Sequence, residues 1–463
     1  MEFKQFYLDC LAHASYLVGD EGVCAIIDPQ RDVEQYLEEA RSRGLEIRHI
    51  IETHLHADFV SGHVELARRT GASIHIGCHA AVDYPHRAMV DGEELRLGGV
   101  KLRFLETPGH TPESMCVLVF EDAQSDSASL ILTGDTLFIG DVGRPDLAGS
   151  QGRSSEEMAG MMYDSLREKI LPLADDVEVF PGHGAGSACG KNISSALSCT
   201  VGHQRATNYA LQDMDKASFI SLLTEGLASA PGYFANSSEM NRQGAPPLSE
   251  LAKPEALSPD ALEALVTSGA WILDVRDASV FGAGHVRGAV NIGLGGRFAS
   301  WVGALVPART RLVLIADQDN AIDEAVMRLA RVGYDDVVGF LAGGFKSWRD
   351  SGREVSNLSQ LSTTELSARL RGGLAVLDVR RLPEFENGHV PGASRIQVEE
   401  LQNRLTELDP DSELAVICQT GYRSSAAASL LERAGFRTLH NVVGGTADWI
   451  EKGHPTESEA VSS

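Results

Sequence analysis

The chain has 463 residues, of which 43% are hydrophobic, and a formal net charge of −25 at pH 7. A single hydrophobic core rarely serves a chain of this length, so we expect two to four domains. The negative charge disfavours a general role on nucleic acid or on an anionic membrane, although a local basic pocket for an anionic substrate stays compatible with it. No apolar run approaches the ~20 residues that span a bilayer, and we expect no secretory signal.

The cysteines form no CxxC pair, which disfavours a disulfide framework and a structural zinc knot. We therefore expect a cytoplasmic protein. The seven cysteines are scattered along the chain: Cys10, Cys24, Cys78, Cys116, Cys189, Cys199 and Cys418.

Residues 1–230 contain short apolar strands that end in loops rich in His, Asp and Gly, with amphipathic helices between some of them. This mixture predicts a layered α/β architecture. Residues 231–257, which are rich in Pro and Gly, are predicted to form an extended linker. The clearest elements are strands at 48–54, 101–106 and 129–134, and helices at 32–43 and 63–69.

After this linker, a pattern of roughly 100 residues occurs twice. Each copy alternates strand and helix, which predicts a parallel sheet covered by helices. We expect the copies at 258–353 and 358–453, followed by a disordered tail at 454–463. The repeated motifs are Trp271–Arg276 with Ala375–Arg380, Gly284–Ala289 with Gly388–Ala393, and Gly343–Trp348 with Gly444–Trp449.

Three candidate metal ligands each follow an apolar strand in the first 230 residues. His54 stands in Thr-His-Leu-His-Ala-Asp-Phe, His110 in Thr-Pro-Gly-His-Thr, and Asp135 in Gly-Asp-Thr. Residues that follow strands in this way can converge at one end of a sheet. Two imidazoles and one carboxylate form the facial triad of iron oxygenases, which leaves positions open. The same set suits a catalytic zinc with a bound water.

This order of motifs resembles the metallo-β-lactamase superfamily over residues 1–230. Two-metal members carry a further histidine where this chain has Phe59. A phenyl ring cannot bind a metal, so this departure favours one metal. Within the superfamily the chain resembles the persulfide dioxygenases, which implies a mononuclear Fe(II) centre held by His54, His110 and Asp135.

The resemblance implies roles for neighbouring polar residues as well. His56, Asp58 and His183 match second-metal ligands of the two-metal relatives. With one metal, we expect these residues to surround the ligands, orient them and handle protons.

Further residues are implied to bind substrate. Arg144, in Gly-Arg-Pro-Asp-Leu, is expected to pair with a substrate carboxylate. Residues 181–191 resemble a loop at the active-site entrance of dioxygenase–rhodanese fusions. This implies that Cys189 lies near the substrate and that Lys191 holds a charged tail. A surface ion pair for Arg144, a buried apolar role for Cys189 and a solvated Lys191 stay open.

A second chemical site is expected in the second copy of the repeat. A short apolar strand leads into Cys418-Gln-Thr-Gly-Tyr-Arg-Ser, with a helix beginning near Ser424. Backbone N–H groups and the helix N-terminus would surround the sulfur, favour a thiolate and hold a persulfide. Arg423 adds a permanent positive charge. The loop resembles the rhodanese active-site loop, and the resemblance covers both copies.

The first copy departs from this pattern at the decisive position. Ala316 or Asp317 occupies the place of the cysteine, and no cysteine lies between Cys199 and Cys418. The first copy therefore cannot carry a cysteine persulfide, and Asp317 and Asp319 would repel an anion. We interpret it as a structural spacer or a docking surface.

Together these patterns predict an α/β chain, in which a metallo-β-lactamase αββα sandwich precedes two rhodanese domains with parallel sheets. They imply a bifunctional enzyme of sulfide detoxification. Fe(II) and O2 would oxidise a low-molecular-weight thiol persulfide to sulfite and thiol, and Cys418 would form or consume thiosulfate. The fusion would raise the effective concentration of the intermediate. The thiol stays open among glutathione, coenzyme A, bacillithiol and polysulfide, and relatives of this type form homo-oligomers.

Three alternatives remain at this point. The first is a zinc thioester hydrolase of the hydroxyacylglutathione hydrolase type, which Phe59 disfavours. The second is a plain thiosulfate sulfurtransferase with a vestigial metal domain. The third is a persulfide sensor or scaffold without turnover.

Overall fold

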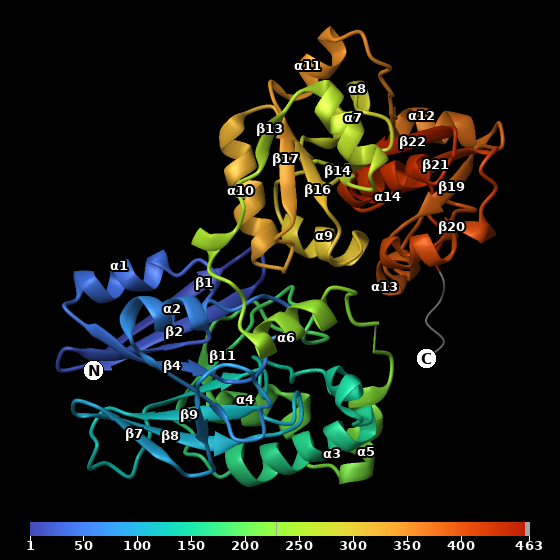
Figure 1. Cartoon of the computed structure of the whole chain (residues 1–463). Coiled ribbons are helices and arrows are strands. Elements are labelled where there is room, and N and C mark those ends of the chain that lie inside the picture. Colours follow the sequence, from blue (N-terminus) through green and yellow to red (C-terminus); the bar gives the residue numbers. More distant parts are fainter. Residues whose placement is uncertain (228, 459–463) are drawn as a thin grey trace. The chain divides into compact units, whose positions relative to one another are not determined.

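The computed structural model describes residues 1–227 and 229–458. Residues 1–251 together with 330–333 form one compact unit, and the other described residues form a second (Figure 1). Among the described residues, no helix combines the length and the apolar character that a membrane crossing requires.

The first unit contains two six-stranded sheets. In each sheet the strands lie side by side in chain order, so each sheet is built from a continuous stretch of sequence. The first sheet comprises β1 (Glu2–Leu8), β2 (His13–Asp20), β3 (Val23–Ile27), β4 (Glu46–Glu52), β5 (Ser73–Gly77) and β6 (Arg87–Met89). The second comprises β7 (Glu94–Leu97), β8 (Val100–Glu106), β9 (Met115–Phe120), β10 (Leu130–Gly134), β11 (Glu178–Pro181) and β12 (Cys199–Thr200).

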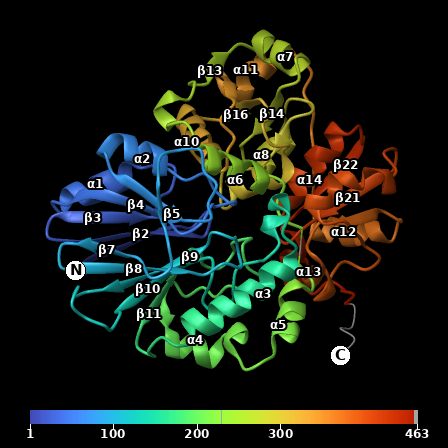
Figure 2. The same ribbon diagram turned by 60° about the horizontal axis from the view of Figure 1, so that its bottom comes forward.

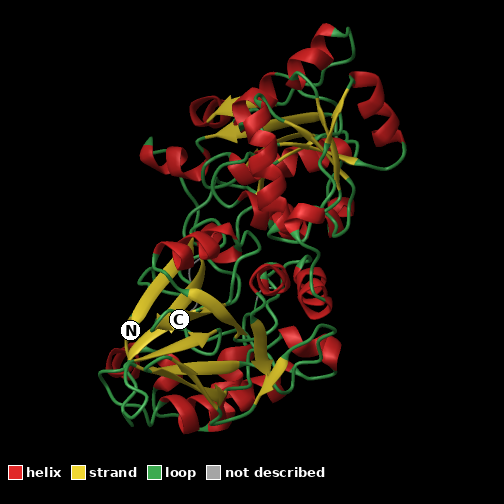
Figure 3. Cartoon of the chain, turned by 60° about the vertical axis from the view of Figure 1, so that its left-hand side comes forward, coloured by secondary structure: helices red, strands yellow, loops and turns green. Residues whose placement is uncertain are grey.

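Three apolar layers hold the two sheets and their helices together (Figures 2 and 3). The central layer lies between the sheets and includes Tyr16 and Ile51 from one sheet and Phe104 and Val117 from the other. The outer layers pack α1 and α2 on the first sheet, and α3 and α5 on the second. This is the expected αββα sandwich. Its helices are α1 (Glu34–Ser42), α2 (His63–Thr70), α3 (Ser155–Ser165), α4 (Val201–Thr207), α5 (Lys216–Thr224) and α6 (Phe234–Gln243).

Local sequence signals explain where several of these helices begin and end. Ser154 and Asp215 accept backbone hydrogen bonds at the starts of α3 and α5, as small polar residues do at helix N-termini. Gly71 ends α2 with a left-handed backbone, φ 77°, which glycine adopts without steric cost.

The stretch that we expected to be an extended linker contains a helix. α6 occupies residues 234–243, and its Asn241 is buried against the loop that follows β4. A propensity argument from Pro and Gly could not find this helix, because tertiary contacts stabilise it.

The second unit contains two five-stranded parallel sheets, ordered β13-β17-β16-β14-β15 and β18-β22-β21-β19-β20. This confirms the predicted parallel sheets. The first copy comprises β13 (Glu255–Leu257), α7 (Pro259–Thr267), β14 (Trp271–Asp274), α8 (Ala278–Ala283), β15 (Val290–Asn291), α9 (Phe298–Leu305), β16 (Leu312–Ile315), α10 (Asp319–Ala330), β17 (Val337–Leu341) and α11 (Gly344–Asp350). The second comprises β18 (Ser359–Ser362), α12 (Thr363–Leu370), β19 (Ala375–Asp378), α13 (Leu382–Glu386), β20 (Ser394–Arg395), β21 (Glu413–Ile417), α14 (Tyr422–Arg433), β22 (Thr438–Val443) and α15 (Gly445–Glu451).

Part of the expected disordered tail is ordered. The backbone of Glu457 exchanges hydrogen bonds of 2.8 and 3.0 Å with His389, and Trp449 Nε1 donates to the carbonyl oxygen of Pro455. Residues 459–463 of the tail lie outside the described residues.

Candidate functional site

The three candidate metal ligands converge where strands of the two sheets end. His54 follows β4, His110 follows β8 and Asp135 follows β10. The side chains are buried, and one ligand atom from each lies within 4.8 Å of the others. Asp135 Oδ2 lies 3.4 Å from His110 Nε2 and 3.9 Å from His54 Nε2.

Hydrogen bonds on the far side of each imidazole turn its Nε2 atom toward this centre. Thr53 Oγ1 donates to Asp28 Oδ2 at 2.9 Å and so accepts from His54 Nδ1 at 3.0 Å. His110 Nδ1 donates to the carbonyl oxygen of Arg144 at 2.8 Å. An imidazole that donates through Nδ1 keeps a lone pair on Nε2, which is the usual arrangement of metal-binding histidines.

The inward-facing atoms of this centre fit a metal ion. His54 Nε2 and both Asp135 carboxylate oxygens have no hydrogen-bond partner among the described residues. Buried polar atoms without partners cost free energy, and a bound cation would remove this cost. Burial and neighbouring imidazoles, His56 and His110 foremost, hold the pKa of His54 well below its usual range, so the ring is the neutral form that binds metals.

Asp58, His183 and Cys189 form a second buried group beside the first. His183 Nε2 lies 3.2 Å from Asp58 Oδ2 and 3.6 Å from Asp135 Oδ1. His183 Nδ1 donates to the carbonyl oxygen of Ala12 at 3.1 Å. Burial and the carboxylates of Asp58 and Asp135 hold the pKa of the Cys189 thiol well above its usual range.

His56 points away from this second group, into a cluster with Asp28 and Glu52. Its Nε2 lies 3.1 Å from Asp28 Oδ1 and 3.4 Å from Glu52 Oε2. Burial lowers the pKa of His56, but the Asp28 and Glu52 carboxylates raise it to about 9 overall. Burial raises the pKa of Glu52 to about 8. Since Asp28 also holds the Thr53 that orients His54, this cluster supports the ligand loop from behind.

The structure gives Arg144 and Lys191 partners within the protein. Arg144 forms a bidentate pair with Asp146, at 2.6 and 2.7 Å, and donates to the carbonyl oxygen of Ala188 at 3.2 Å. Lys191 Nζ donates to the carbonyl oxygens of Leu222 and Glu225 at the end of α5. These contacts are compatible with a positioning role, and the expected contacts with substrate stay predictions.

Phe59 is buried next to two histidine rings. Its ring centroid lies 4.0 Å from that of His13 and 4.4 Å from that of His56. His13, which also contacts the His183 ring, was missed by the sequence analysis because it stands alone at the start of β2 without a motif. Phe59 and His13 therefore line one side of the site.

Two further supports of the site were missed. Asn241 of α6 donates to the carbonyl oxygens of His56 and Phe59, at 2.8 and 2.7 Å, and accepts from the Ser61 amide. Gly143 lies so close to the site that a Cβ atom would stand 2.1 Å from the Asp135 carbonyl oxygen. The sequence carried a signal for Gly143, in the Asp-Val-Gly-Arg stretch, but none for Asn241.

The Cys418 loop lies between β21 and α14, as expected. The Gly421 amide and the Ser424 hydroxyl donate to Cys418 Sγ at 3.2 and 3.4 Å. Gly421 has φ 103°, a backbone conformation that suits glycine and turns its N–H toward the sulfur. Donors aimed at one sulfur stabilise a thiolate or the outer sulfur of a persulfide.

Arg423 contacts a carboxylate as well as the pocket. Its guanidinium forms a bidentate pair with Glu384, at 2.6 and 2.8 Å, and lies 5.9 Å from the ring centroid of Trp301. Trp301 belongs to α9 of the first copy.

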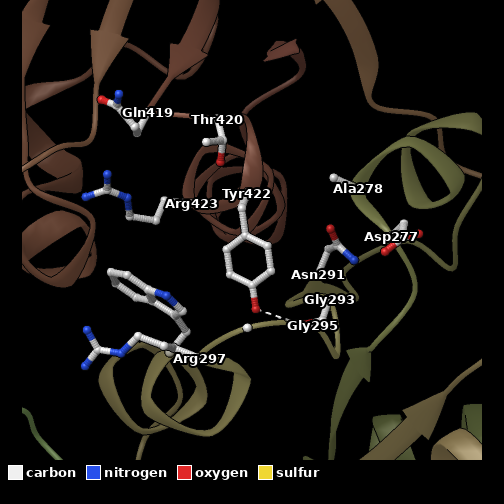
Figure 4. Close-up of a pocket in the computed structure, with 12 residues that line it drawn as sticks. Asp277, Ala278, Asn291, Gly293, Gly295, Arg297, Gln419, Thr420, Tyr422 and Arg423 are labelled. Carbon is white, nitrogen blue, oxygen red and sulfur yellow. Dashed lines mark hydrogen bonds between the residues drawn. The ribbon is translucent and has the colours of Figure 1, made fainter. Parts of the chain in front are cut away.

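A cavity of about 450 Å³ lies between the two copies of the repeat (Figure 4). The second copy contributes residues of the Cys418 loop, among them Tyr422, whose hydroxyl donates to the carbonyl oxygen of Gly293 at 2.7 Å. The first copy therefore forms one wall of this pocket, a role that our interpretation as spacer or docking surface did not include. The first copy lines the pocket with Asp277, Ala278, Asn291, Gly293, Gly295, Gly296, Arg297 and Trp301.

Ala316 of the first copy takes the position of Cys418. Ala316 directly follows β16 and Cys418 directly follows β21. A Cβ on Gly344 would lie 2.5 Å from the Ala316 carbonyl oxygen, and one on Gly445 would lie 2.3 Å from that of Cys418. Between the two positions that the sequence left open, the structure thus selects Ala316.

Comparison with known families divides the chain into the same parts, the metal domain and the two copies of the repeat. Residues 8–183 match the metallo-beta-lactamase superfamily, and residues 258–351 and 362–452 match the rhodanese-like domain. These ranges fall inside the predicted domains, whose limits stay predictions. The chain belongs to the metallo-beta-lactamase superfamily and joins that domain to tandem rhodanese domains.

Named relatives are similar to parts of the chain. A hydroxyacylglutathione hydrolase of Methylococcus capsulatus is 33% identical over 242 residues, which cover 50% of this chain and 85% of the relative. One of Rhodospirillum rubrum is 36% identical over 164 residues, which cover 35% of this chain and only 57% of the relative. A crystal structure of a metallo-beta-lactamase from Staphylococcus aureus subsp. aureus COL is 32% identical, with a TM-score of 0.66, and covers 74% of this chain and 98% of that one.

The family and the two sites together support an enzyme of sulfur metabolism. A superfamily metal centre and a rhodanese-type cysteine loop lie on one chain. The buried donor set of the centre indicates a bound metal.

Proposed function

We propose that this chain is an Fe(II)- and O2-dependent persulfide dioxygenase coupled to a sulfurtransferase. The overall oxidation is R–S–SH + O2 + H2O → R–SH + sulfite + 2H⁺, where R–SH is a low-molecular-weight thiol. The observation that carries the proposal is a buried triad of two imidazoles and one carboxylate with unpaired inward atoms, on the same chain as a cysteine loop built for sulfane sulfur.

His54, His110 and Asp135 would hold the metal. When bound, iron(II) supplies the redox chemistry that dioxygen requires and that zinc lacks. In the proposal one iron ion at this triad is sufficient for catalysis, because Phe59 stands where two-metal relatives carry a histidine.

The chain's own residues prepare this site for the reaction. Thr53 and the Arg144 carbonyl oxygen keep His54 and His110 in the metal-binding tautomer. His183 and Asp58, 3.2 Å apart, can hold and release a proton beside the centre. The buried rings of Phe59 and His13 exclude water from one side. In this proposal, Cys189 and Lys191 lie along the path of the thiol and Arg144 neutralises its carboxylate.

Cys418 carries out the second reaction. Its thiolate attacks the outer sulfur of thiosulfate, forms the Cys418 persulfide and releases sulfite. The reverse reaction uses the same atoms to make thiosulfate from sulfite. Arg423 and the Gly421 amide stabilise the negative charge at that sulfur. We propose that the protein works in the cytoplasm, as a homo-oligomer, in sulfide detoxification.

A zinc thioester hydrolase is the second candidate. Two relatives favour it, because both are named hydroxyacylglutathione hydrolases. The deciding experiment measures the metal content of the purified full-length protein, then O2 uptake, sulfite and thiosulfate with a panel of persulfides. A glutathione thioester serves as the competing substrate. Iron with persulfide-dependent O2 uptake supports the dioxygenase, whereas zinc with thioester hydrolysis alone contradicts it.

A further inference from the structure

We propose that Arg331 is a positioning residue of the metal centre. It acts through the turn Ala330–Gly333, which holds the metal loop, residues 54–61, that carries His54 and Asp58. This turn follows α10 within the sequence of the first copy of the repeat, yet its four residues belong to the first compact unit. The inference rests on the proposed function in so far as the triad binds a metal. It gives the sequence of the first copy a second role, separate from sulfur transfer.

The side chain of Arg331 fixes the position of the turn. Its Nε and Nη2 atoms donate to the two carboxylate oxygens of Asp32, at 2.8 and 2.7 Å. The two side chains are 15 and 23% exposed. A bidentate pair between arginine and a carboxylate sets orientation as well as distance, and partial burial protects this one from screening by salt. The turn is therefore attached to the segment that precedes α1.

The backbone of the same turn holds the metal loop. The Val60 amide donates to the carbonyl oxygen of Arg331 at 2.7 Å. The guanidinium of Arg31 donates to the carbonyl oxygen of Ala330 at 2.6 Å. Val60, Arg31 and Ala330 are buried, so breaking either hydrogen bond would leave polar groups away from water. Arg331 thus contacts Asp32 with its side chain and Val60 with its carbonyl oxygen.

Helix α6 packs on this turn and also holds the metal loop. Asn236 Nδ2 donates to the carbonyl oxygen of Gly333 at 3.4 Å. Gly333 has φ 82°, and a Cβ atom there would stand 2.9 Å from Asn236 Nδ2. Asn241 of the same helix donates to the carbonyl oxygens of His56 and Phe59. The turn and α6 therefore support neighbouring residues of one loop.

The residues directly before Val60 contribute to the site. Asp58 Oδ2 lies 3.2 Å from His183 Nε2, and Phe59 is buried against His13 and His56. A shift of Val60 would displace Asp58 and Phe59 together. Loss of the Arg331 side chain should therefore alter the surroundings of the metal.

Cobalt(II) titration of the metal-free full-length protein tests this role without persulfide or oxygen. The titration gives the affinity for the first equivalent, and the visible d–d bands report the geometry of its ligands. Arg331→Gln and Asp32→Asn should each weaken this binding about fivefold and change the bands, because each breaks the same ion pair. The double variant should lose no more affinity than the weaker single variant, since the pair can be broken only once.

Two results of this titration would overturn the proposal. One is unchanged affinity and unchanged bands in both single variants. The other is a lowered melting temperature without a change in affinity or bands, which would leave the ion pair with a stabilising role only. Arg433→Gln is the matched control, because Arg433 stands two residues before Gly435 as Arg331 does before Gly333. It should behave as the wild type.

Gly333→Ala tests the turn without changing the ion pair. The positive φ and the nearby Asn236 oppose a Cβ atom, so the turn should move away from α6 and cause a similar loss of affinity. Gly435 has φ 101°, and a Cβ there would meet no atom of the described residues within 4 Å. Gly435→Ala therefore introduces backbone strain alone and should keep the affinity. Equal losses in the two variants would overturn the role of the turn.

Persulfide-dependent O2 uptake of the iron-loaded proteins separates this inference from the proposed function. Arg331→Gln should lower kcat about fivefold and leave the KM for persulfide within twofold, because Asp58 is displaced. A raised KM with unchanged kcat would overturn the positioning role. A wild type without O2 uptake would contradict the proposed function, and the cobalt titration would then decide the inference by itself.

Discussion

The Nδ1 atom of His110 lies 2.8 Å from the backbone carbonyl oxygen of Arg144. The same arginine uses its guanidinium to bind Asp146 and the Ala188 carbonyl oxygen. Arg144 thereby connects a metal ligand to the loop that carries Cys189. This relationship gives the arginine a positioning role that can be separated from the binding of a substrate carboxylate.

Arg144→Lys should weaken the binding of iron by about 10–100-fold, because lysine cannot form the bidentate pair that holds this segment. Competition with a chelator measures the affinity, and O2 uptake measures the KM for persulfide. Arg153→Ala, which removes an exposed arginine of the same unit, serves as control. A raised KM with unchanged iron affinity would contradict the positioning role and leave Arg144 with the proposed substrate contact alone.

Cys418→Ser should abolish sulfur transfer from thiosulfate and leave persulfide-dependent O2 uptake within twofold of the wild type. The reason is that the hydroxyl cannot form a persulfide, whereas the iron triad is unchanged. Both activities are measured on the same preparation, with Cys199→Ser as control. Loss of O2 uptake in Cys418→Ser would mean that the metal site depends on the rhodanese cysteine.

Arg297→Ala tests whether the first copy contributes to sulfur transfer. Arg297 lines the cavity beside the Cys418 loop (Figure 4), so its loss should raise the KM for thiosulfate about tenfold, as expected for one charge-assisted hydrogen bond. Arg311→Ala removes an exposed arginine of the same copy and should have no effect. Equal KM values for all three proteins would leave the first copy with a structural role only.

Acid should destabilise the first unit partly through His75. Burial, then the neighbouring His49, lowers the pKa of His75 to about 4. The unfolded chain takes up a proton near pH 6.5, whereas the folded state resists it until pH 4. The contribution of His75 to the free energy of unfolding is therefore complete above pH 6.5. It is lost as the pH falls, by about 2 kcal/mol between pH 7.5 and 5.

Denaturant unfolding at the two pH values checks this expectation. His75→Leu should reduce the difference in unfolding free energy between pH 7.5 and pH 5. The exposed His203 provides the control variant His203→Gln, which should leave the difference unchanged. An unchanged pH dependence in His75→Leu would assign the acid sensitivity to other groups.

Much of the architecture could be predicted from the sequence, because the informative signals are local. The strand that leads into His54 and the strand that leads into Cys418 are apolar runs followed by loops with distinctive residues. The repeated Asp-Val-Arg and Gly-His-Val motifs revealed the two copies. In each copy the Arg of the Asp-Val-Arg motif donates a hydrogen bond to the Asp, as Arg276 does to Asp274.

The remaining features depend on contacts between distant segments, which one sequence does not show. Asn241 donates a hydrogen bond to the loop after β4, although the sequence predicts its segment to be a linker. Cys189 lies near Asp58 although about 130 residues separate them, and Arg297 of the first copy lines the same cavity as the Cys418 loop of the second. The choice between Ala316 and Asp317 as the counterpart of Cys418 also required the structure, because an alignment of the two copies allows its gap at two places.

The proposed chemistry is tested most directly by O2 consumption with glutathione persulfide, compared between iron-loaded and zinc-loaded preparations of the full-length protein. We predict that the iron form consumes one O2 for each sulfite or thiosulfate formed, and that the zinc form consumes none. The iron-loaded protein showing no persulfide-dependent O2 uptake, with any thiol of the panel, would contradict the proposed function.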